Sequence, residues 1–313
     1  MASASISLRG VSVRYPDGPL AVREVDLEIG SGELLVLLGA SGSGKSTLLR
    51  TINRLVPPTS GTILIDGRDA AALEPVELRR RIGYVIQAVG LFPHLTVGEN
   101  VAIVPQLLGW EPARIEARVQ ELLRLVRLDP SYRERLPRML SGGEQQRVGV
   151  ARALAAEPPI LLMDEPFGAV DAIVRLELQN ELLAIHRELG TTIVFVTHDV
   201  DEALRLAQRV AVVHTGTLVQ ADAPLRLLAA PRTPYVADLV GAADVLRRLS
   251  LITAGEAAEA APNFSESGRV IEPHATLREA LGRILTEGEP LILAGNGPRR
   301  IVDIAAIAKA VRA

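Results

Sequence analysis

The sequence predicts an α/β fold in which helices cover a parallel sheet. Short, wholly apolar segments recur along the chain, and amphipathic segments with helical periodicity separate them. This alternation is typical of parallel sheets, because each connection between parallel strands has to be long enough to contain a helix. The first apolar segment also ends in a glycine-rich loop that leads into a helical pattern. The buried strands predicted in this way are residues 34–39, 160–163, 192–197 and 209–214.

The pattern changes along the chain, which predicts a division into domains. We expect a main domain over residues 1–240, with a mostly helical, Arg- and Leu-rich subdomain over about 90–150. Small residues are frequent in 241–268, so this segment is predicted to be a linker. Residues 269–313 then have strand, helix, strand, strand and helix patterns, which predict a small α/β module.

Composition excludes several kinds of site and partner. The 313 residues contain no cysteine, so disulfides and thiolate metal sites are excluded. The net charge of −3 gives no basic face for nucleic acid, and we expect no such partner. The first ten residues lack a signal-peptide pattern, and no apolar run approaches the roughly 18 residues that span a bilayer. We therefore expect a soluble, cytoplasmic protein.

A phosphate-binding loop is predicted after the first buried strand. Residues 39–46 match the pattern G-x-x-x-x-G-K-S, in which glycines allow a tight turn and backbone N–H groups point inward. Lys45 is expected to contact the β- and γ-phosphates of a nucleotide, and the Ser46 hydroxyl to bind Mg²⁺. A glycine loop can also be merely flexible, but its place between a strand and a helix favours nucleotide binding. The expected contacts are Gly39, Ala40, Ser41, Gly42, Ser43, Gly44, Lys45, Ser46 and Thr47.

Lysine usage supports a special role for Lys45. Only two of the 34 basic residues are lysines, Lys45 and Lys309, and the others are arginines. Arginine therefore serves wherever this chain needs a general positive charge. A lysine at position 45 indicates a site that requires a compact ammonium group instead of a planar guanidinium.

Two acidic residues and a histidine end later buried strands. Asp164 and Glu165 lie at a strand's carboxyl end, where parallel α/β sheets bind ligands. We interpret Asp164 as an anchor for Mg²⁺ and Glu165 as the residue that polarises the attacking water. His198 is expected to contact the γ-phosphate and to orient Glu165. The alternatives are a surface charge pair before a turn and a packing histidine; the upstream glycine loop favours the catalytic interpretation.

The segment Leu140–Arg147, with the sequence LSGGEQQR, resembles the signature motif of ABC transporter ATPases. The resemblance covers roughly residues 5–240, and the family's other motifs occur there in the family's order. These motifs are the glycine loop (Walker A), Gln87 in the Q-loop, the signature, Walker B at 160–165, a D-loop at 168–171 and His198. The D-loop has the sequence GAVD where the family usually has GALD.

This resemblance implies an ATP-hydrolysing enzyme that uses Mg²⁺ and works as a dimer. Two subunits would enclose two ATP molecules, with each signature loop facing the glycine loop of the other subunit. The N-terminus of the helix after the signature would supply a second anion site, and Tyr15 corresponds to the aromatic residue that stacks on adenine. The further nucleotide contacts implied are Gln87, Ser141, Gly142, Gly143, Asp164, Asp171 and His198. The catalytic residues implied are Lys45, Gln87, Glu165 and His198, and the metal ligands are Ser46, Gln87 and Asp164.

The resemblance also implies partners and a location. The ATPase dimer would bind two transmembrane permease subunits, as a peripheral protein on the cytoplasmic side of the inner membrane. The surface around residues 87–95 would contact the permease, because the Q-loop joins the γ-phosphate site to the helical subdomain. An extracytoplasmic solute-binding protein would act indirectly, through the permease.

Further segments resemble the branch of ABC importers that takes up quaternary amines such as glycine betaine, choline or carnitine. They are residues 52–55, 75–87, 90–96, 104–110 and 153–159. An importer of another small solute is the alternative.

The tail resembles a regulatory module. This branch often carries two CBS modules at the C-terminus, and residues 269–313 resemble a single, degenerate one. Because one such module leaves an apolar sheet face open, we expect the tails of two subunits to pair. The exposed face is expected to include Leu291, Ile292, Leu293 and Ile301.

Two other functional classes share some of these features. DNA-repair and chromosome-maintenance ATPases have the same motifs but insert long coiled coils between the glycine loop and the signature. Only about 95 residues separate the two motifs here, without sustained heptads. A regulatory binding module, in which the tail senses a ligand and ATP hydrolysis is secondary, would instead be indicated by nucleotide binding to the isolated tail.

Overall fold

The computed structural model describes residues 3–16, 18–87, 90–168, 170–261, 269–295 and 300–312. The chain divides into two compact units, Met1–Ala221 and Asp222–Ala313.

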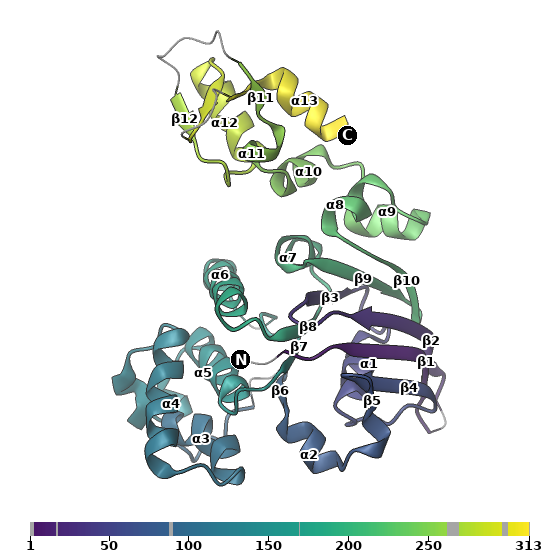
Figure 1. Ribbon diagram of the computed structural model, residues 1–313, viewed down its shortest axis with the longest axis vertical. Helices are drawn as coiled ribbons and strands as arrows, with labels where there is room; N and C mark the ends of the chain where they lie inside the picture. The colour runs from purple at the N-terminus through teal and green to yellow at the C-terminus, as the bar shows by residue number, and fades with distance from the viewer. Residues whose placement is uncertain are drawn as a thin grey trace. The chain divides into compact units, whose positions relative to one another are not determined.

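The centre of the first unit is a six-stranded sheet with the order β10-β9-β3-β8-β7-β6 (Figure 1). Strands β9, β3, β8, β7 and β6 run parallel to one another, as the alternation of strands and helices predicts. All five residues of β3 are buried, which explains its wholly apolar sequence. The strands are β3 (Leu34–Leu38), β6 (Ile82–Val85), β7 (Ile160–Asp164), β8 (Thr192–Thr197), β9 (Arg209–His214) and β10 (Thr217–Asp222).

A second sheet of the same unit has the order β2-β1-β4-β5, and its paired strands are antiparallel. Apolar side chains of β1 and β2 share one core with those of β3, β7, β8 and α1. This core holds the first helix, and therefore the loop before it, against the parallel sheet. The strands are β1 (Ile6–Arg14), β2 (Leu20–Ile29), β4 (Ser60–Ile65) and β5 (Arg68–Asp69), and the helix is α1 (Lys45–Ile52).

Helices α3, α4 and α5 form a group beside the parallel sheet, between β6 and β7 in the sequence (Figure 1). This group corresponds to the predicted helical subdomain. Its helices are α3 (Val97–Leu107), α4 (Pro112–Leu125) and α5 (Gly142–Leu154), with 3₁₀ turns at Pro130–Glu134 and Pro137–Met139. The remaining helices of the unit are α2 (Pro75–Arg80), α6 (Ala172–Leu189), α7 (Val200–Leu206) and a 3₁₀ turn at Ala70–Ala72.

The second unit contains helices and a small sheet with the order β11-β14-β13-β12. From β12 onwards its elements follow the predicted order of strand, helix, strand, strand and helix. Its elements are α8 (Pro224–Ala229), α9 (Pro234–Val240), α10 (Val245–Leu251), α11 (Ala254–Ala257), β11 (Glu259–Ala260), β12 (Arg269–Ile271), α12 (Leu277–Glu287), β13 (Leu291–Leu293), β14 (Arg300–Val302) and α13 (Ile304–Arg312).

The segment expected to be a linker contributes to this second unit. Residues 245–260 form two helices and a strand, and residues 262–268 lie outside the described part of the chain. Leu249, Ile252 and Ala254 are buried in the same core as Leu277 and Leu291. Although its composition is typical of a linker, most of this segment is therefore packed structure.

The open face of the small sheet differs from the expected one. Leu291 is fully buried on the helix-covered side, and Leu293 packs against the same core. Side chains alternate along a strand, so Val270, Ile292 and Ile301 lie on the opposite face. These three residues are paired in register across β12, β13 and β14. Among the described residues, no helix has both the length and the apolar character needed to cross a bilayer.

Candidate active site

Four adjacent parallel strands bring the predicted site residues to one edge of the sheet. The glycine loop follows β3, His198 follows β8, Asp164 ends β7 with Glu165 after it, and Gln87 follows β6. Because β3, β8, β7 and β6 are neighbours in this order and run in the same direction, their carboxyl ends meet. This is the edge at which parallel α/β sheets bind ligands.

The glycine loop requires glycine at two positions for steric reasons. Gly44 has a φ of +102° and precedes the first residue of α1, and a Cβ atom there would lie 2.4 Å from the Ala21 carbonyl oxygen. A Cβ atom on Gly39 would lie 2.2 Å from the carbonyl oxygen of Val213. Both distances are far below any van der Waals contact, so the close approach of the loop to β2 and β9 depends on these glycines.

Lys45 is buried beneath the loop, with only 4% of its surface exposed. Its Nζ donates hydrogen bonds to the carbonyl oxygens of Gly39, at 2.8 Å, and Ala40, at 2.9 Å. Burial lowers the pKa of Lys45, while the charges of Glu165 and Asp164 act in the opposite direction. A cavity of about 220 Å³ lies at this point, lined by Ala21, Ser41, Gly42, Ser43, Gly44, Lys45, Ser46, Thr47 and Glu165.

Asp164 is the buried anchor of the site, with 1% of its surface exposed. It accepts hydrogen bonds from Ser46 Oγ at 2.7 Å, from Arg50 at 3.0 Å and from the Tyr84 hydroxyl at 3.4 Å. Arg50 and Tyr84 were not predicted as site residues. Arg50 could have been found, because it lies one helical turn after Ser46 and so on the same face of α1.

Glu165 joins two of the predicted catalytic residues. Its Oε2 accepts a hydrogen bond from Gln87 Nε2 at 3.1 Å and lies 3.3 Å from His198 Nδ1. The backbone of Glu165 has a φ of +44°, which is unusual for a residue other than glycine. Its N–H donates to the Val196 carbonyl oxygen of β8, which holds this conformation. Strained backbone of this kind is concentrated at functional sites.

The signature residues lie at the start of α5. Ser141 caps this helix and forms a reciprocal capping box with Glu144, which also accepts a hydrogen bond from Tyr132. A Cβ atom on Gly142 would meet no heavy atom within 4 Å, whereas one on Gly143 would lie 2.6 Å from Val174 Cγ1, so this helix start is open at its first residue. The lining of the cavity beside Lys45 does not include Ser141, Gly142 or Gly143.

The remaining predicted residues lie at the margins of the site. Tyr15 is 40% exposed, and its hydroxyl lies 3.2 Å from Thr47 Oγ1. Asp171 caps α6 by accepting hydrogen bonds from the backbone N–H groups of Ile173 and Val174. Ala169 of the D-loop lies outside the described residues.

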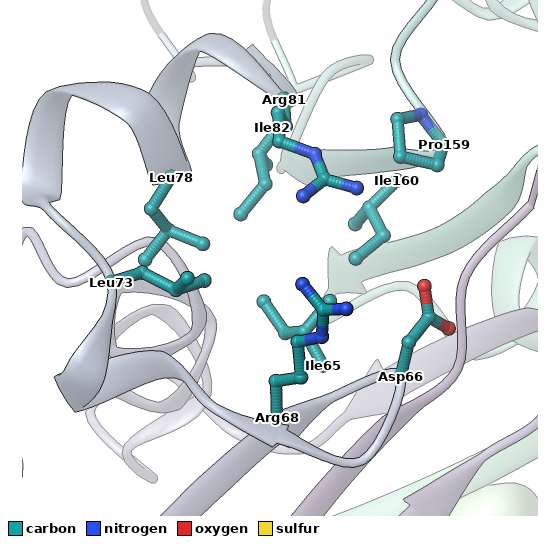
Figure 2. Close-up of a pocket in the computed structure, with 9 residues that line it drawn as sticks. All are labelled: Ile65, Asp66, Arg68, Leu73, Leu78, Arg81, Ile82, Pro159 and Ile160. Atoms are coloured by element: carbon teal, nitrogen blue, oxygen red, sulfur yellow. The ribbon is translucent and has the colours of Figure 1, made fainter.

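A second cavity, of about 260 Å³, lies at the opposite ends of β6 and β7 (Figure 2). Apolar side chains, including Ile65, Ile82 and Ile160, line it, and the guanidinium groups of Arg68 and Arg81 point into it. Ile82 and Ile160 are the first residues of their strands. This cavity is therefore at the amino edge of the sheet and is separate from the glycine loop.

Comparison with known proteins agrees with this geometry. Residues 22–168 match the sequence profile of the ABC transporter family. The chain is 48% identical over 263 residues to the osmoprotectant import ATP-binding protein OsmV of Salmonella typhimurium, with 84% of this chain and 68% of that protein covered. It is also 48% identical to the glycine betaine uptake system ATP-binding protein YehX of Escherichia coli, with 86% of this chain and 87% of that protein covered.

A solved structure also resembles this chain. It is a dimer of the ATP-binding cassette MJ0796 in a post-hydrolysis state with ADP and Pi, at a TM-score of 0.63 and 34% identity. The match covers 70% of this chain and 98% of the other. The predicted P-loop ATPase fold and enzyme class are confirmed. The chain therefore belongs to the ABC transporter family, as an ATP-binding subunit of the importer type.

Proposed function

We propose that this chain hydrolyses ATP to drive the import of a quaternary amine, such as glycine betaine, choline or carnitine. The observation that carries the ATPase part is the convergence of the glycine loop, Asp164, Glu165, Gln87 and His198 at one sheet edge. The solute class is supported by the names of the relatives, which refer to osmoprotectants and glycine betaine. An importer of another small solute is the alternative.

The geometry supports a distinct role for each residue around the nucleotide. The glycine loop and the start of α1 present N–H groups and a positive helix end to the phosphates. Lys45 lies beneath this loop and would neutralise charge on the β- and γ-phosphates. Tyr15, beside Thr47 at the end of the loop, is placed to stack on adenine.

Glu165 would orient and polarise the attacking water. Glu165 lines the cavity beside the loop. Gln87, which follows β6, and His198, which follows β8, contact its carboxylate from the two strands that flank β7. Gln87 would also link the γ-phosphate site to the helical subdomain, and His198 would contact the γ-phosphate. Phosphoryl transfer is catalysed chiefly by positioning and by electrostatic stabilisation, and this arrangement supplies both.

The residues around Ser46 suit Mg²⁺. Ser46 Oγ and Asp164 Oδ1 are 2.7 Å apart, so two hard oxygen donors already lie together, and the amide oxygen of Gln87 is a third candidate ligand. Mg²⁺ keeps several waters and prefers few protein ligands together with phosphate oxygens, which fits a site with so few carboxylates. When bound, the ion would neutralise charge on the β- and γ-phosphates.

The exposed start of α5 supports a dimeric arrangement. Ser141, Gly142 and Gly143 lie outside the cavity that holds Lys45, yet this helix start is open and suited to an anion. We propose that it contacts the γ-phosphate bound by the partner subunit, with Asp171 at the same interface. The dimer would bind two permease subunits on the cytoplasmic side of the membrane, through the surface around residues 87–95, of which 88 and 89 lie outside the described residues.

We propose that the tail is a single CBS-like module that pairs with a second copy of itself. The order of elements after β12 supports this assignment, and the in-register row of Val270, Ile292 and Ile301 supplies an apolar contact face. Pairing of two such faces would hold the two ATPase subunits together without nucleotide, since the apolar area is buried independently of ATP.

Transport by the complete complex tests the proposed function. The full chain should be reconstituted in vesicles with its cognate permease and solute-binding protein, and uptake of labelled glycine betaine, choline and carnitine measured with ATP and Mg²⁺. We expect uptake of at least one of them, abolished by Glu165→Gln. Uptake of an unrelated solute alone would contradict the quaternary-amine assignment, whereas a lack of ATP hydrolysis would contradict the ATPase assignment.

A further inference from the structure

Helix α6 begins directly after the D-loop and runs beside the segment that carries His198. Arg175 lies one turn into this helix, and Asp171 is the residue that caps it. The Arg175 side chain is 32% exposed, so this residue is neither a free surface group nor a core residue. Its guanidinium contacts both the D-loop and the segment after β8.

The contacts of Arg175 use separate atoms of the guanidinium. One terminal nitrogen donates to the Val170 carbonyl oxygen of the D-loop at 3.3 Å. The other donates to Asp199 Oδ2 at 3.4 Å, and Nε lies 4.0 Å from Glu202 Oε1. A planar fork can make such contacts at the same time, whereas an ammonium is a point charge at the end of a flexible chain.

The residues on both sides of His198 are fixed by the same helix. Asp199 follows His198, caps α7 and pairs with Arg175. Thr197 precedes His198 and donates to Glu202 Oε2 at 2.6 Å, and Gln179 of α6 donates to the other oxygen of Glu202 at 3.2 Å. The backbone of His198 is therefore held on both sides by contacts that lead to α6, directly from Asp199 and through Glu202 of α7 from Thr197.

We propose that Arg175 is a positioning residue that couples the D-loop to His198. It fixes Asp199 and, through the adjoining backbone, the imidazole that lies 3.3 Å from Glu165. It also holds the Val170 carbonyl, so a displacement of the D-loop is transmitted to the histidine through a single side chain. This inference rests on the proposed roles of Glu165 and His198 in hydrolysis.

A purely structural ion pair is the competing explanation. Partly exposed pairs contribute little to stability, typically below about 1 kcal/mol. Arg175, however, lies within ion-pair distance of two carboxylates, those of Asp199 and Glu202, and its removal would leave both without this neutralising charge. The first consequence of its loss is therefore a displaced Asp199, and with it a displaced His198, instead of global unfolding.

Steady-state ATP hydrolysis by the full chain, as part of its transporter complex, separates the two explanations. We expect Arg175→Ala to lower kcat about tenfold while the KM for ATP changes less than about twofold, because positioning is lost and nucleotide contacts are not. Arg175→Lys should recover only part of the loss, since it cannot form the fork. Arg205→Ala is the matched control: Arg205 of α7 donates to Asn180 of α6, and no hydrogen bond or ion pair joins it to the described residues of either loop, so its removal should leave kcat within about twofold.

A double-mutant cycle tests the path through Asp199. If Arg175 acts through this carboxylate, adding Asp199→Asn to Arg175→Ala should lower kcat little further than the larger of the two single changes does. Additive effects on kcat, a kcat of Arg175→Ala close to that of the unmodified chain, or equal losses for Arg175→Ala and Arg205→Ala would each overturn the inference. A complex of the unmodified chain that hydrolyses no ATP would overturn the proposed function itself.

Discussion

Ser46 Oγ donates a hydrogen bond of 2.7 Å to Asp164 Oδ1, although 118 positions separate the two residues in the chain. Ser46 follows β3 and Asp164 ends β7, and one strand, β8, lies between these two in the sheet. The glycine loop and the strand-end acid therefore belong to one site. Both side chains offer oxygen, so this pair is where the nucleotide's metal ion would be bound.

Glu165→Gln should nearly abolish steady-state ATP hydrolysis while ATP binding is retained. The amide keeps the size of the carboxylate but cannot polarise water as effectively, and the nucleotide contacts of the loop remain. Phosphate release and equilibrium binding of ATP measure the two properties, and the bound variant should form a more persistent dimer. Glu157→Gln, which changes an exposed glutamate that pairs only with Arg114 at 3.6 Å among the described ion pairs, should hydrolyse normally.

Hydrolysis at near the unmodified rate in Glu165→Gln would refute the catalytic assignment. Loss of ATP binding in the same variant would instead point to misfolding.

Lys45→Arg should weaken ATP binding by at least about tenfold although the charge is conserved. Lys45 is buried and hydrogen-bonded to two carbonyl oxygens of its own loop, so a bulkier planar group would displace the loop. Isothermal titration with ATP measures the effect. Lys309→Arg is the matched control, because it changes the other lysine of the chain, which pairs with Glu259 in the second unit. Unchanged ATP affinity in Lys45→Arg would contradict its role as a phosphate ligand.

Gly44→Ala should disrupt the glycine loop much more than Gly42→Ala. Both residues have positive φ, which costs alanine about 1–2 kcal/mol. At Gly44 the new methyl group would also lie 2.4 Å from the Ala21 carbonyl oxygen, whereas at Gly42 it would meet no heavy atom within 4 Å. ATP affinity and thermal unfolding should both fall more for Gly44→Ala. Equal effects of the two substitutions would show that the loss comes from the positive φ alone and not from the contact with the Ala21 carbonyl oxygen.

Ile292→Asp should convert the nucleotide-free full chain from dimer to monomer if the tails pair. Ile292 lies at the centre of the apolar row with Val270 and Ile301, and a charge there would be costly to bury. Light scattering at micromolar concentration measures the change. Leu285→Asp is the control, because Leu285 is an exposed apolar residue of α12, outside this row. If the unmodified chain is already monomeric without nucleotide, the tail is not a dimerisation device.

The sequence by itself determined the type of fold and the chemistry of the site. Apolar strands and helical patterns are set by local burial, so their alternation predicted the parallel sheet. The glycine loop, LSGGEQQR and the two acids at the carboxyl end of β7 are contiguous motifs, and contiguous motifs are visible without a structure. Lys45 was also marked by the composition, because it is one of only two lysines.

Only the tertiary structure decided which distant side chains meet. Arg50 and Tyr84 contact Asp164, and Arg175 reaches Asp199, through an order of strands and helices that no local pattern encodes. The boundary between the two units, after Ala221, and the packing of residues 245–260 into the core of the second unit were not predicted, for the same reason. Small residues suit a linker and a close-packed core equally well, and only long-range packing distinguishes the two.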